Sequence, residues 1–358
     1  MSTPKITVVV TVYNIAEYLP RFFESMAKQS FGDYKLLIID DGSTDDSLAV
    51  CRAYAKKDSR IELHSIEHVG IAAARNYSME LLDTEYTAHA DGDDYVEPEY
   101  LEHLWNAEQK YQADWVLSRV AYHLEGIDGI ADTFTAIGER LIPKSEFPKK
   151  LPFLLDDSRL NYLYGKLYKT EFFKDCRVEP DVRQGSDTML NCQYLLKINN
   201  IVVIDDIDYH YFKYRSRSIT SYSGEDAFAR ILRIDSVLYP TMERAGLLND
   251  KMLFAIHKRI LWSVPGIVER ILKSDESPLE QERQIDAILQ NERYKQAFSW
   301  TKEHGFGGAE LTFEPIPPQS GKTYRKHFQK KQHILRIKAK ILAICPKFIL
   351  EWRERRHG

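Results

Sequence analysis

The sequence places an acidic loop where a cation could bind. Asp91, Gly92, Asp93 and Asp94 directly follow a short apolar run, so two carboxylates stand at positions i and i+2, with a glycine between them that allows a tight turn. Carboxylates in this arrangement can hold Mg²⁺ or Mn²⁺ and leave coordination positions for substrate phosphates. The alternative is a solvated acidic turn. A second acidic loop, at the end of another apolar run, favours the metal site.

This second loop begins with Asp40 and Asp41, directly after the apolar run 36–39. A carboxylate at the end of a strand can accept a hydrogen bond from a nucleobase imide or a ribose hydroxyl. Helix capping is the alternative use of these residues, and we expect Ser43 or Asp45 to cap the next helix. Asp40 and Asp41 then remain for a ligand.

An aromatic ring accompanies the two loops. Tyr13 follows the β-branched run 6–12, in which Val12 is the last residue, and precedes Asn14. The Tyr13 ring suits stacking on a nucleobase. A buried tyrosine with a satisfied hydroxyl is the alternative.

The elements between these residues predict how they come together. Residues 6–118 alternate between apolar runs and segments of helical periodicity, a pattern typical of right-handed βαβ units and a largely parallel sheet. Ligands of such sheets bind outside the carboxyl ends of the strands, so the three loops should share one edge. We expect strands at 6–12, 36–39, 61–64, 86–90 and 115–118. We expect helices at 15–26, 48–54 and 70–82, and after Pro98.

Composition excludes several classes of protein. The chain has 358 residues, 44% hydrophobic and 28% charged, as expected for a globular protein of two domains or of one large domain with an extension. Its four cysteines form no CxxC pair, which argues against a disulfide scaffold or a cysteine zinc site and favours a reducing compartment. No signal-peptide pattern, membrane-spanning run, Walker loop or serine-nucleophile elbow is present.

The motifs in combination resemble the family 2 glycosyltransferases of the GT-A fold, a Rossmann-like α/β fold. The resemblance covers about the first 120 residues. It is carried by residues 8–14, 39–45, 74–76 and 91–94. It implies an inverting transferase that uses a nucleotide-activated sugar, commonly a UDP-sugar, with Mg²⁺ or Mn²⁺.

The resemblance also implies roles for single residues. Tyr13 and Asp41 would contact the base, Asp91 and Asp93 the ribose and the metal-bound pyrophosphate, and Arg75 would lie near the phosphates. The remaining residues assigned to the donor site are Val12, Asn14, Asp40, Gly92, His210 and Arg215. Asp91, Asp93 and His210 are the assigned metal ligands.

The second half of the chain adds an acceptor side. Residues 161–169 resemble the acceptor segment of the family, and residues 184–190 resemble its Gly-Glu-Asp segment, with Ser186 in place of the glutamate. Asp187 is therefore the expected general base, with helix capping as its alternative. His210 precedes Arg215 in what looks like a strand leading to a loop over the donor phosphates. A hydrogen-bonded core histidine is the alternative for His210.

Charge divides the chain unevenly. Residues 321–358 hold twelve Lys and Arg against two Glu, a net +10, although the whole chain has a net charge of −4. The isoleucines of this segment recur every three or four residues, as in a basic amphipathic helix at an anionic membrane surface. Packing on the acidic body or a dimer contact are the alternatives. Nucleic-acid binding is not expected, because no recognition module accompanies the charge.

These observations predict a catalytic domain at 1–222, with a nucleotide-sugar half (1–120) and an acceptor half (121–222). A helical extension (223–320) and the basic tail (321–358) follow. The expected activity is metal-dependent transfer of a hexosyl or N-acetylhexosaminyl group to a lipid-linked or surface glycan, at the cytoplasmic face of the cell membrane. Transfer to a protein side chain, or a catalytically silent nucleotide-sugar-binding scaffold, are the alternatives. The sequence does not predict an oligomeric state.

Overall fold

The apolar runs of the first 120 residues form the parallel half of one sheet. The computed structural model describes residues 3–304, except 127, 131, 180–181, 183–184 and 214–223, and also residues 316–318 and 322. Its strands are β1 (Ile6–Val12), β2 (Tyr34–Asp41), β3 (Ile61–Ile66), β4 (Tyr86–Asp91), β5 (Tyr95–Val96), β6 (Trp115–Leu124), β7 (Asp132–Thr133), β8 (Arg140–Pro143), β9 (Lys166–Lys169) and β10 (Asn200–Lys213). The expected strands are confirmed, most of them with longer bounds.

Helices alternate with the first strands and then dominate the C-terminal part. They are α1 (Leu19–Ala27), α2 (Ser47–Ala55), α3 (Ile71–Glu80), α4 (Tyr100–Tyr111), α5 (Phe147–Asp156), α6 (Thr170–Phe173), α7 (Ser186–Leu195), α8 (Gly224–Arg244), α9 (Asp250–Lys273), α10 (Pro278–Leu289) and α11 (Glu292–Glu303). Two 3₁₀ turns, Lys144–Glu146 and Arg159–Asn161, lie before and after α5. The expected mixed α/β fold with C-terminal helices is confirmed.

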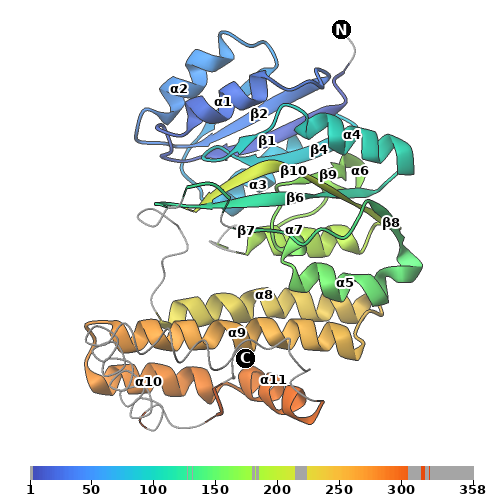
Figure 1. Ribbon diagram of the computed structural model, residues 1–358. Helices are drawn as coiled ribbons and strands as arrows, with labels where there is room; N and C mark the ends of the chain where they lie inside the picture. The colour runs from blue at the N-terminus through green and yellow to red at the C-terminus, as the bar shows by residue number, and fades with distance from the viewer. Residues whose placement is uncertain are drawn as a thin grey trace, which may run out of the picture. The chain divides into compact units, whose positions relative to one another are not determined.

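The sheet has the strand order β3-β2-β1-β4-β9-β6-β10-β5 (Figure 1). Strands β3, β2, β1 and β4 run parallel, as do β6 and β10, whereas β9 is antiparallel to both β4 and β6. Because the first four strands are parallel, β1, β2 and β4 all end on one edge, here called the carboxyl edge. Val12 pairs with Asp40, and Thr11 with Asp91, across this edge.

Alternate residues of β1 face opposite sides of the sheet, as the period of a strand requires. Val8 and Val10 belong to a core completed by α1, α2 and α4, whereas Val9 belongs to a core completed by α3, α5, α6 and α7. Figure 1 shows α1 and α2 on one side of the sheet and α3 and α7 on the other. Both faces of the parallel strands are covered, which explains their uninterrupted apolar sequences.

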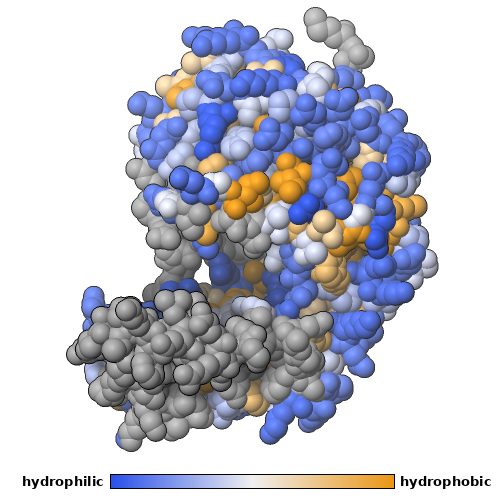
Figure 2. All heavy atoms as spheres, viewed as in Figure 1, coloured by the Kyte–Doolittle hydropathy of each residue, from blue (hydrophilic) through white to orange (hydrophobic). Residues whose placement is uncertain are grey.

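The chain divides into two compact units. The first comprises 1–221 and 232–256, and the second comprises 222–231 and 257–358. The first unit therefore includes a helical segment beyond the expected boundary at residue 222. Leu238, Met242 and Met252 of this segment are buried in the α3–α5–α7 core. On the face of the first unit seen in Figure 2, hydrophobic side chains gather where Figure 1 shows β6, β8 and β10.

The second unit is helical where the structure describes it. Ser277 caps α10 by accepting a hydrogen bond from the Glu280 N–H, and Asn291 caps α11. The buried Tyr294 donates its hydroxyl hydrogen to the Ile316 carbonyl at 2.5 Å. Within the parts of both units that the structure describes, no helix combines the length and apolar character needed to cross a membrane. The basic tail lies outside the described residues, apart from Lys322.

Candidate active site

The loops after β1 and β2 are joined by hydrogen bonds between side chains and backbone. Asn14, with a left-handed φ of 54°, accepts hydrogen bonds from the Thr44 and Asp45 N–H groups at 2.8 and 3.3 Å. In return, Ser43 Oγ accepts from the Asn14 N–H, and Asp45 accepts from the Ala16 N–H. Asp45 also accepts from the N–H of Ser47, the first residue of α2, but the N-cap of α2 is Asp46, so the expected capping by Ser43 or Asp45 is wrong. These bonds fix two of the predicted loops as one surface.

Asp40 and Asp41 are both buried but have different surroundings. Asp41 accepts hydrogen bonds from the Val69 and Gly70 N–H groups at 2.8 and 3.0 Å, so its carboxylate holds the loop that leads into α3. Asp40 accepts from Ser65 Oγ through one oxygen, while its buried Oδ1 has no hydrogen-bond partner among the described residues. A buried acceptor without a partner is costly. Asp40 therefore has a free acceptor that a ligand could satisfy.

Tyr13 is exposed rather than buried, which excludes the alternative of a satisfied core tyrosine. Its ring is 42% exposed and stacks on His68 with a centroid distance of 4.1 Å. His68 Nδ1 lies 3.0 Å from the Asp41 carbonyl oxygen and 3.0 Å from Asp41 Oδ2. His68 is thus a site residue that the sequence did not reveal, since the stack depends on two loops that are far apart in the chain.

The acidic loop after β4 has two partly accessible carboxylates, those of Asp91 and Asp93, and one fully buried carboxylate, that of Asp94. Asp91 is 34% exposed, and Asp94 is buried and accepts hydrogen bonds from the Tyr209 hydroxyl at 2.7 Å and the Phe212 N–H at 2.9 Å. Asp94 thus anchors β10 to the loop. Burial raises the pKa of Asp91, and the charges of Asp93 and Asp187 raise it further, against the opposing effect of Arg75. A divalent cation would relieve this crowding of negative charge.

Gly92 packs closely against neighbouring side chains and does not have a left-handed backbone conformation. A Cβ at this position would lie 2.8 Å from Ile15 Cδ1 and 3.0 Å from Leu19 Cδ2. The Gly92 backbone therefore packs directly on the side chains of Ile15 and Leu19, whose ends would have to move to admit a Cβ. The tight turn predicted from the sequence is present, because the Asp94 N–H donates to the Asp91 carbonyl at 3.1 Å.

Arg75 connects the acidic loop with the candidate base. Its guanidinium, 7% exposed, donates hydrogen bonds to Ser186 Oγ at 2.6 Å and to Asp187 Oδ1, and lies 4.0 Å from Asp91 Oδ1. Asp187 accepts a further hydrogen bond from the Leu163 N–H at 3.3 Å. The three predicted residues Arg75, Asp91 and Asp187 therefore meet, although they come from α3, β4 and α7.

Asp187 does not cap its helix. The N-cap of α7 is Gly185, with a left-handed φ of 85°, and Asp187 is the second helical residue. Its position in the first turn places the carboxylate near the positive end of the helix dipole. The carboxylate is 19% exposed. The capping alternative is thereby excluded, and the side chain remains available for chemistry.

His210 is a hydrogen-bonded core histidine, which was the alternative to its predicted role as a metal ligand. The ring is buried, stacks on Tyr95 at 4.2 Å, and its Nδ1 lies 2.9 Å from His123 Nε2. Its Nε2 lies 2.9 Å from Glu97 Oε1. Both ring nitrogens of His210 thus face other partners than Asp91 and Asp93. No group of three or more metal-ligating side chains occurs among the described residues. Arg215 lies outside them.

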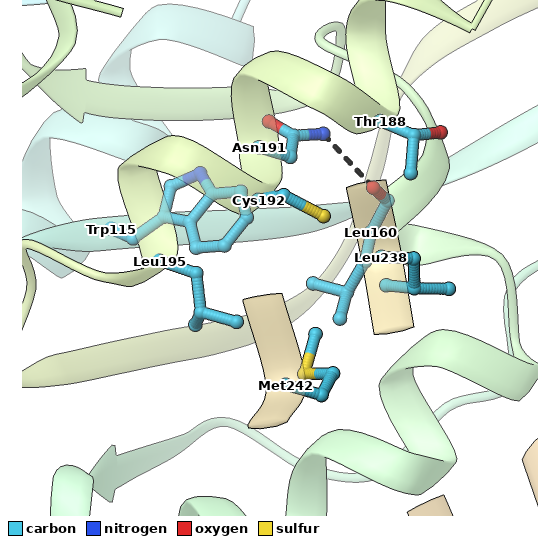
Figure 3. Close-up of a pocket in the computed structure, with 8 residues that line it drawn as sticks. All are labelled: Trp115, Leu160, Thr188, Asn191, Cys192, Leu195, Leu238 and Met242. Atoms are coloured by element: carbon cyan, nitrogen blue, oxygen red, sulfur yellow. Dashed lines mark hydrogen bonds between the residues drawn. The ribbon is translucent and has the colours of Figure 1, made fainter. Parts of the chain in front are cut away.

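A small cavity lies behind α7 rather than at the site (Figure 3). It measures about 10 Å³ and is lined by side chains from β6, α7, α8 and the 3₁₀ turn Arg159–Asn161: Trp115, Leu160, Thr188, Asn191, Cys192, Leu195, Leu238 and Met242. The Asn191 amide donates to the Leu160 carbonyl at its rim at 3.1 Å. This volume is close to that of a single water molecule. The cavity is too small for a nucleotide sugar.

The geometry defines a class of protein. The carboxyl edge of a parallel sheet holds an exposed ring, a buried acceptor and an acidic loop, and a carboxylate from the acceptor half reaches the same place. This is the arrangement that the resemblance to the GT-A glycosyltransferases predicted. Residues 7–176, slightly less than half of the chain, match the model of the family described as Glycosyl transferase family 2.

Curated relatives agree with the family. Over 220 residues, covering 58% of this chain and 30% of the relative, the chain is 28% identical to glycosyltransferase GlyA of Streptococcus pneumoniae. It is 29% identical over 216 residues to the poly(ribitol-phosphate) beta-glucosyltransferase of Bacillus spizizenii, covering 58% of this chain and 32% of that protein. The chain thus spans about a third of the length of these two relatives.

A solved structure shows the same fold. The crystal structure of S. aureus TarS residues 1–349 in complex with UDP-GlcNAc superposes with a TM-score of 0.54 at 17% identity, covering 87% of this chain and 99% of that one. At this identity the likeness concerns the fold alone.

Proposed function

We propose that this protein is a metal-dependent, inverting glycosyltransferase that transfers a sugar from a UDP-sugar to a hydroxyl of a glycan acceptor. The observation that carries the proposal is the contact of Arg75 with both Asp187 and Asp91. Through this contact, the candidate base Asp187 lies close to Asp91, where the diphosphate would bind. The family match and the UDP-GlcNAc bound to TarS support a nucleotide-sugar donor.

The donor would lie along the carboxyl edge. The Tyr13 ring offers a face for the base, and Asp40 Oδ1 offers the acceptor that a base imide or a ribose hydroxyl would satisfy. The oxygen ligands Asp91 and Asp93 suit a hard cation, and these two residues would hold Mg²⁺ or Mn²⁺ together with phosphate oxygens. Such a cation supplies positive charge that stabilises the departing diphosphate.

The reaction balances with the residues present. The acceptor oxygen forms a bond to the anomeric carbon while the bond from that carbon to the diphosphate oxygen breaks, and the acceptor proton passes to Asp187. Attack on the face opposite the leaving group inverts the anomeric configuration. Arg75 and the Leu163 N–H orient the Asp187 carboxylate through hydrogen bonds to its two oxygens.

Two measurements test the donor and the base. Isothermal titration should show UDP binding that strengthens when Mn²⁺ is added, and absence of binding by any nucleoside diphosphate would refute the donor assignment. Asp187→Asn should lower transfer by at least about 100-fold, the lower range for a positioned base, and leave UDP affinity near normal. Asp206→Asn, which changes a carboxylate that is 44% exposed, is the matched control. Transfer retained by Asp187→Asn would place the base elsewhere.

We further propose that the acceptor is a lipid-linked or surface glycan and that the enzyme works at the cytoplasmic face of the cell membrane. The net +10 of residues 321–358 supports the membrane location. Deleting residues 321–358 should abolish binding to vesicles containing anionic lipid, with neutral vesicles as control. Unchanged binding would refute the membrane role of the tail.

A further inference from the structure

A column of tyrosine rings runs from the core toward the surface of the first unit. Tyr209 is fully buried and stacks on Tyr164 with a centroid distance of 4.7 Å and an interplanar angle of 6°. Tyr164, 3% exposed, stacks on Tyr162 at 5.0 Å and 11°. Tyr211 also stacks on Tyr164, at 5.5 Å and 20°. Tyr162 and Tyr211 are half-buried, so the column reaches solvent through these two rings.

This tyrosine column, defined as Tyr162, Tyr164, Tyr209 and Tyr211, is attached to both halves of the site. At its buried end, the Tyr209 hydroxyl accepts a hydrogen bond from the Asp91 N–H at 2.9 Å and donates to Asp94. At its other end, Tyr162 directly precedes Leu163, whose N–H binds the Asp187 carboxylate. The column is therefore bonded directly to the acidic loop, and its Tyr162 adjoins in the chain the residue that binds the candidate base.

The column is held rigidly in place. Lys166, which is buried, donates hydrogen bonds to the Tyr162 and Tyr164 carbonyls at 2.5 and 3.1 Å, and Asn191 of α7 donates to the Tyr162 carbonyl at 2.9 Å. The helix that carries Asp187 thus also fixes the backbone of Tyr162. Flat aromatic rings of low conformational entropy, next to a few fixed polar groups, are typical of sites for small ligands.

We propose that Tyr162 and Tyr211 form the acceptor subsite and that they bind an uncharged pyranose ring through its C–H face, with the attacking hydroxyl directed to Asp187. The inference rests on the proposed function and names its acceptor class. A flat aromatic surface complements the face of a cyclic sugar. An acyclic polyol phosphate, such as the ribitol phosphate named for one relative, presents no such face.

Charge favours the same class of acceptor. Residues 1–222 hold 25 Lys and Arg against 36 Asp and Glu, a net −11. Beside the column, the Tyr209 hydroxyl and the Phe212 N–H both donate to Asp94, and the Tyr209 hydroxyl accepts from the Asp91 N–H, so the acidic loop adjoins the rings. A polyanionic acceptor would approach this surface against repulsion, whereas a neutral sugar ring would not.

Saturation-transfer difference NMR on the full-length protein, saturated with UDP and Mn²⁺, tests the subsite. The probes are the methyl β-pyranosides of glucose, galactose and N-acetylglucosamine, with ribitol 5-phosphate as the acyclic comparison. We expect saturation of the ring C–H protons of at least one pyranoside, and at least a tenfold loss of its affinity in Tyr162→Ala and in Tyr211→Ala. Tyr162→Phe, which keeps the ring, should restore most of the affinity lost in Tyr162→Ala.

Tyr54→Ala is the matched control, because Tyr54 is also half-buried and stacks on Phe23 at 4.6 Å and 17° away from the site. UDP titration of every variant reports folding and donor binding separately. Three results would overturn the subsite while leaving UDP binding intact. They are a saturation signal from ribitol phosphate alone, no signal from any pyranoside, or an equal pyranoside signal in Tyr162→Ala and in the wild-type protein. Loss of UDP binding by the wild-type protein would instead refute the proposed function.

Discussion

Arg75 is expected to stabilise the fold as well as the site, because it is a nearly buried cation between two carboxylates. Arg75→Gln keeps a hydrogen-bonding side chain but removes the charge that faces Asp187 and Asp91. Breaking a fully buried ion pair from one side costs about 3–5 kcal/mol, since the remaining charge is left unpaired. Asp187 and Asp91 are 19% and 34% exposed, which lets water compensate part of this loss.

We therefore expect Arg75→Gln to lower the stability of the metal-free protein by about 2–3 kcal/mol. For a unit of this size, that corresponds to a fall of roughly 4–12 °C in the Tm of the first thermal transition. Differential scanning calorimetry at pH 7.5 in the presence of EDTA measures it. Arg60→Gln is the matched control: it removes an Arg–Asp pair at 2.7 Å whose side chains are 30% and 25% exposed. We expect Arg60→Gln to lower the stability of the protein by only about 0–1 kcal/mol.

A double-mutant cycle isolates the pair itself. Asp187→Asn removes the carboxylate charge that Arg75 compensates. In that background, Arg75→Gln should therefore lower the free energy of unfolding by less than it does in the wild-type protein. The expected coupling lies at about 1–3 kcal/mol, within the range for residues in direct contact. Equal effects of Arg75→Gln and Arg60→Gln, or a coupling below about 0.5 kcal/mol, would refute the view that Arg75 is held by these carboxylates.

Two further predictions concern acid sensitivity and the helix that carries the base. Burial lowers the pKa of His89 from 6.5 to about 3. Below about pH 6.5 the unfolded chain therefore protonates this ring while the folded protein keeps it neutral. The free energy of unfolding then falls by about 1.4 kcal/mol for each pH unit. Between pH 8 and pH 5, His89→Gln should thus lose about 2 kcal/mol less than wild type in thermal or denaturant unfolding, and parallel losses would contradict this. Gly185→Ala should cost at least about 2 kcal/mol, because φ is +85° and the new Cβ would lie 2.6 Å from a side-chain carbon of α8. Gly246→Ala, with φ of +68° and open space around it, should cost only the backbone part of about 1 kcal/mol, and similar melting shifts for both variants would exclude the steric effect.

Local patterns predicted the elements and the edge of the sheet at which the site lies. The β-branched run 6–12 matches β1 residue for residue, and Gly70 stands at the N-cap of α3, where the sequence predicted a helix to open. Strand periodicity and turn residues act over a few positions, so they can be recognised without tertiary information. The handedness of βαβ units then places the loops after β1, β2 and β4 together.

The roles of single residues within that edge depended on contacts that local patterns do not encode. Two adjacent aspartates diverge, Asp41 binding the loop before α3 and Asp40 keeping a free oxygen. His210 belongs to a cluster with His123 and Glu97, because β10 pairs with β5 and β6. Tyr209 and Tyr211 are two positions apart in β10, and residues with this spacing point to the same face of a strand. This spacing was the sequence signal that could have indicated a shared face for both rings.

The sequence by itself determined the fold class and the three acidic and aromatic loops, because these follow from residue types and short spacings. The choice of Asp187 as the candidate base came from the resemblance of residues 184–190 to a segment of the family. Only the tertiary structure decided that Arg75 joins Asp187 to Asp91, a contact across 112 positions of the chain, and that four tyrosines from two distant segments stack into one column. Such contacts arise because α3 and α7 pack on the sheet that contains β10. Their free energy comes from burial shared by many residues, which no single segment contains.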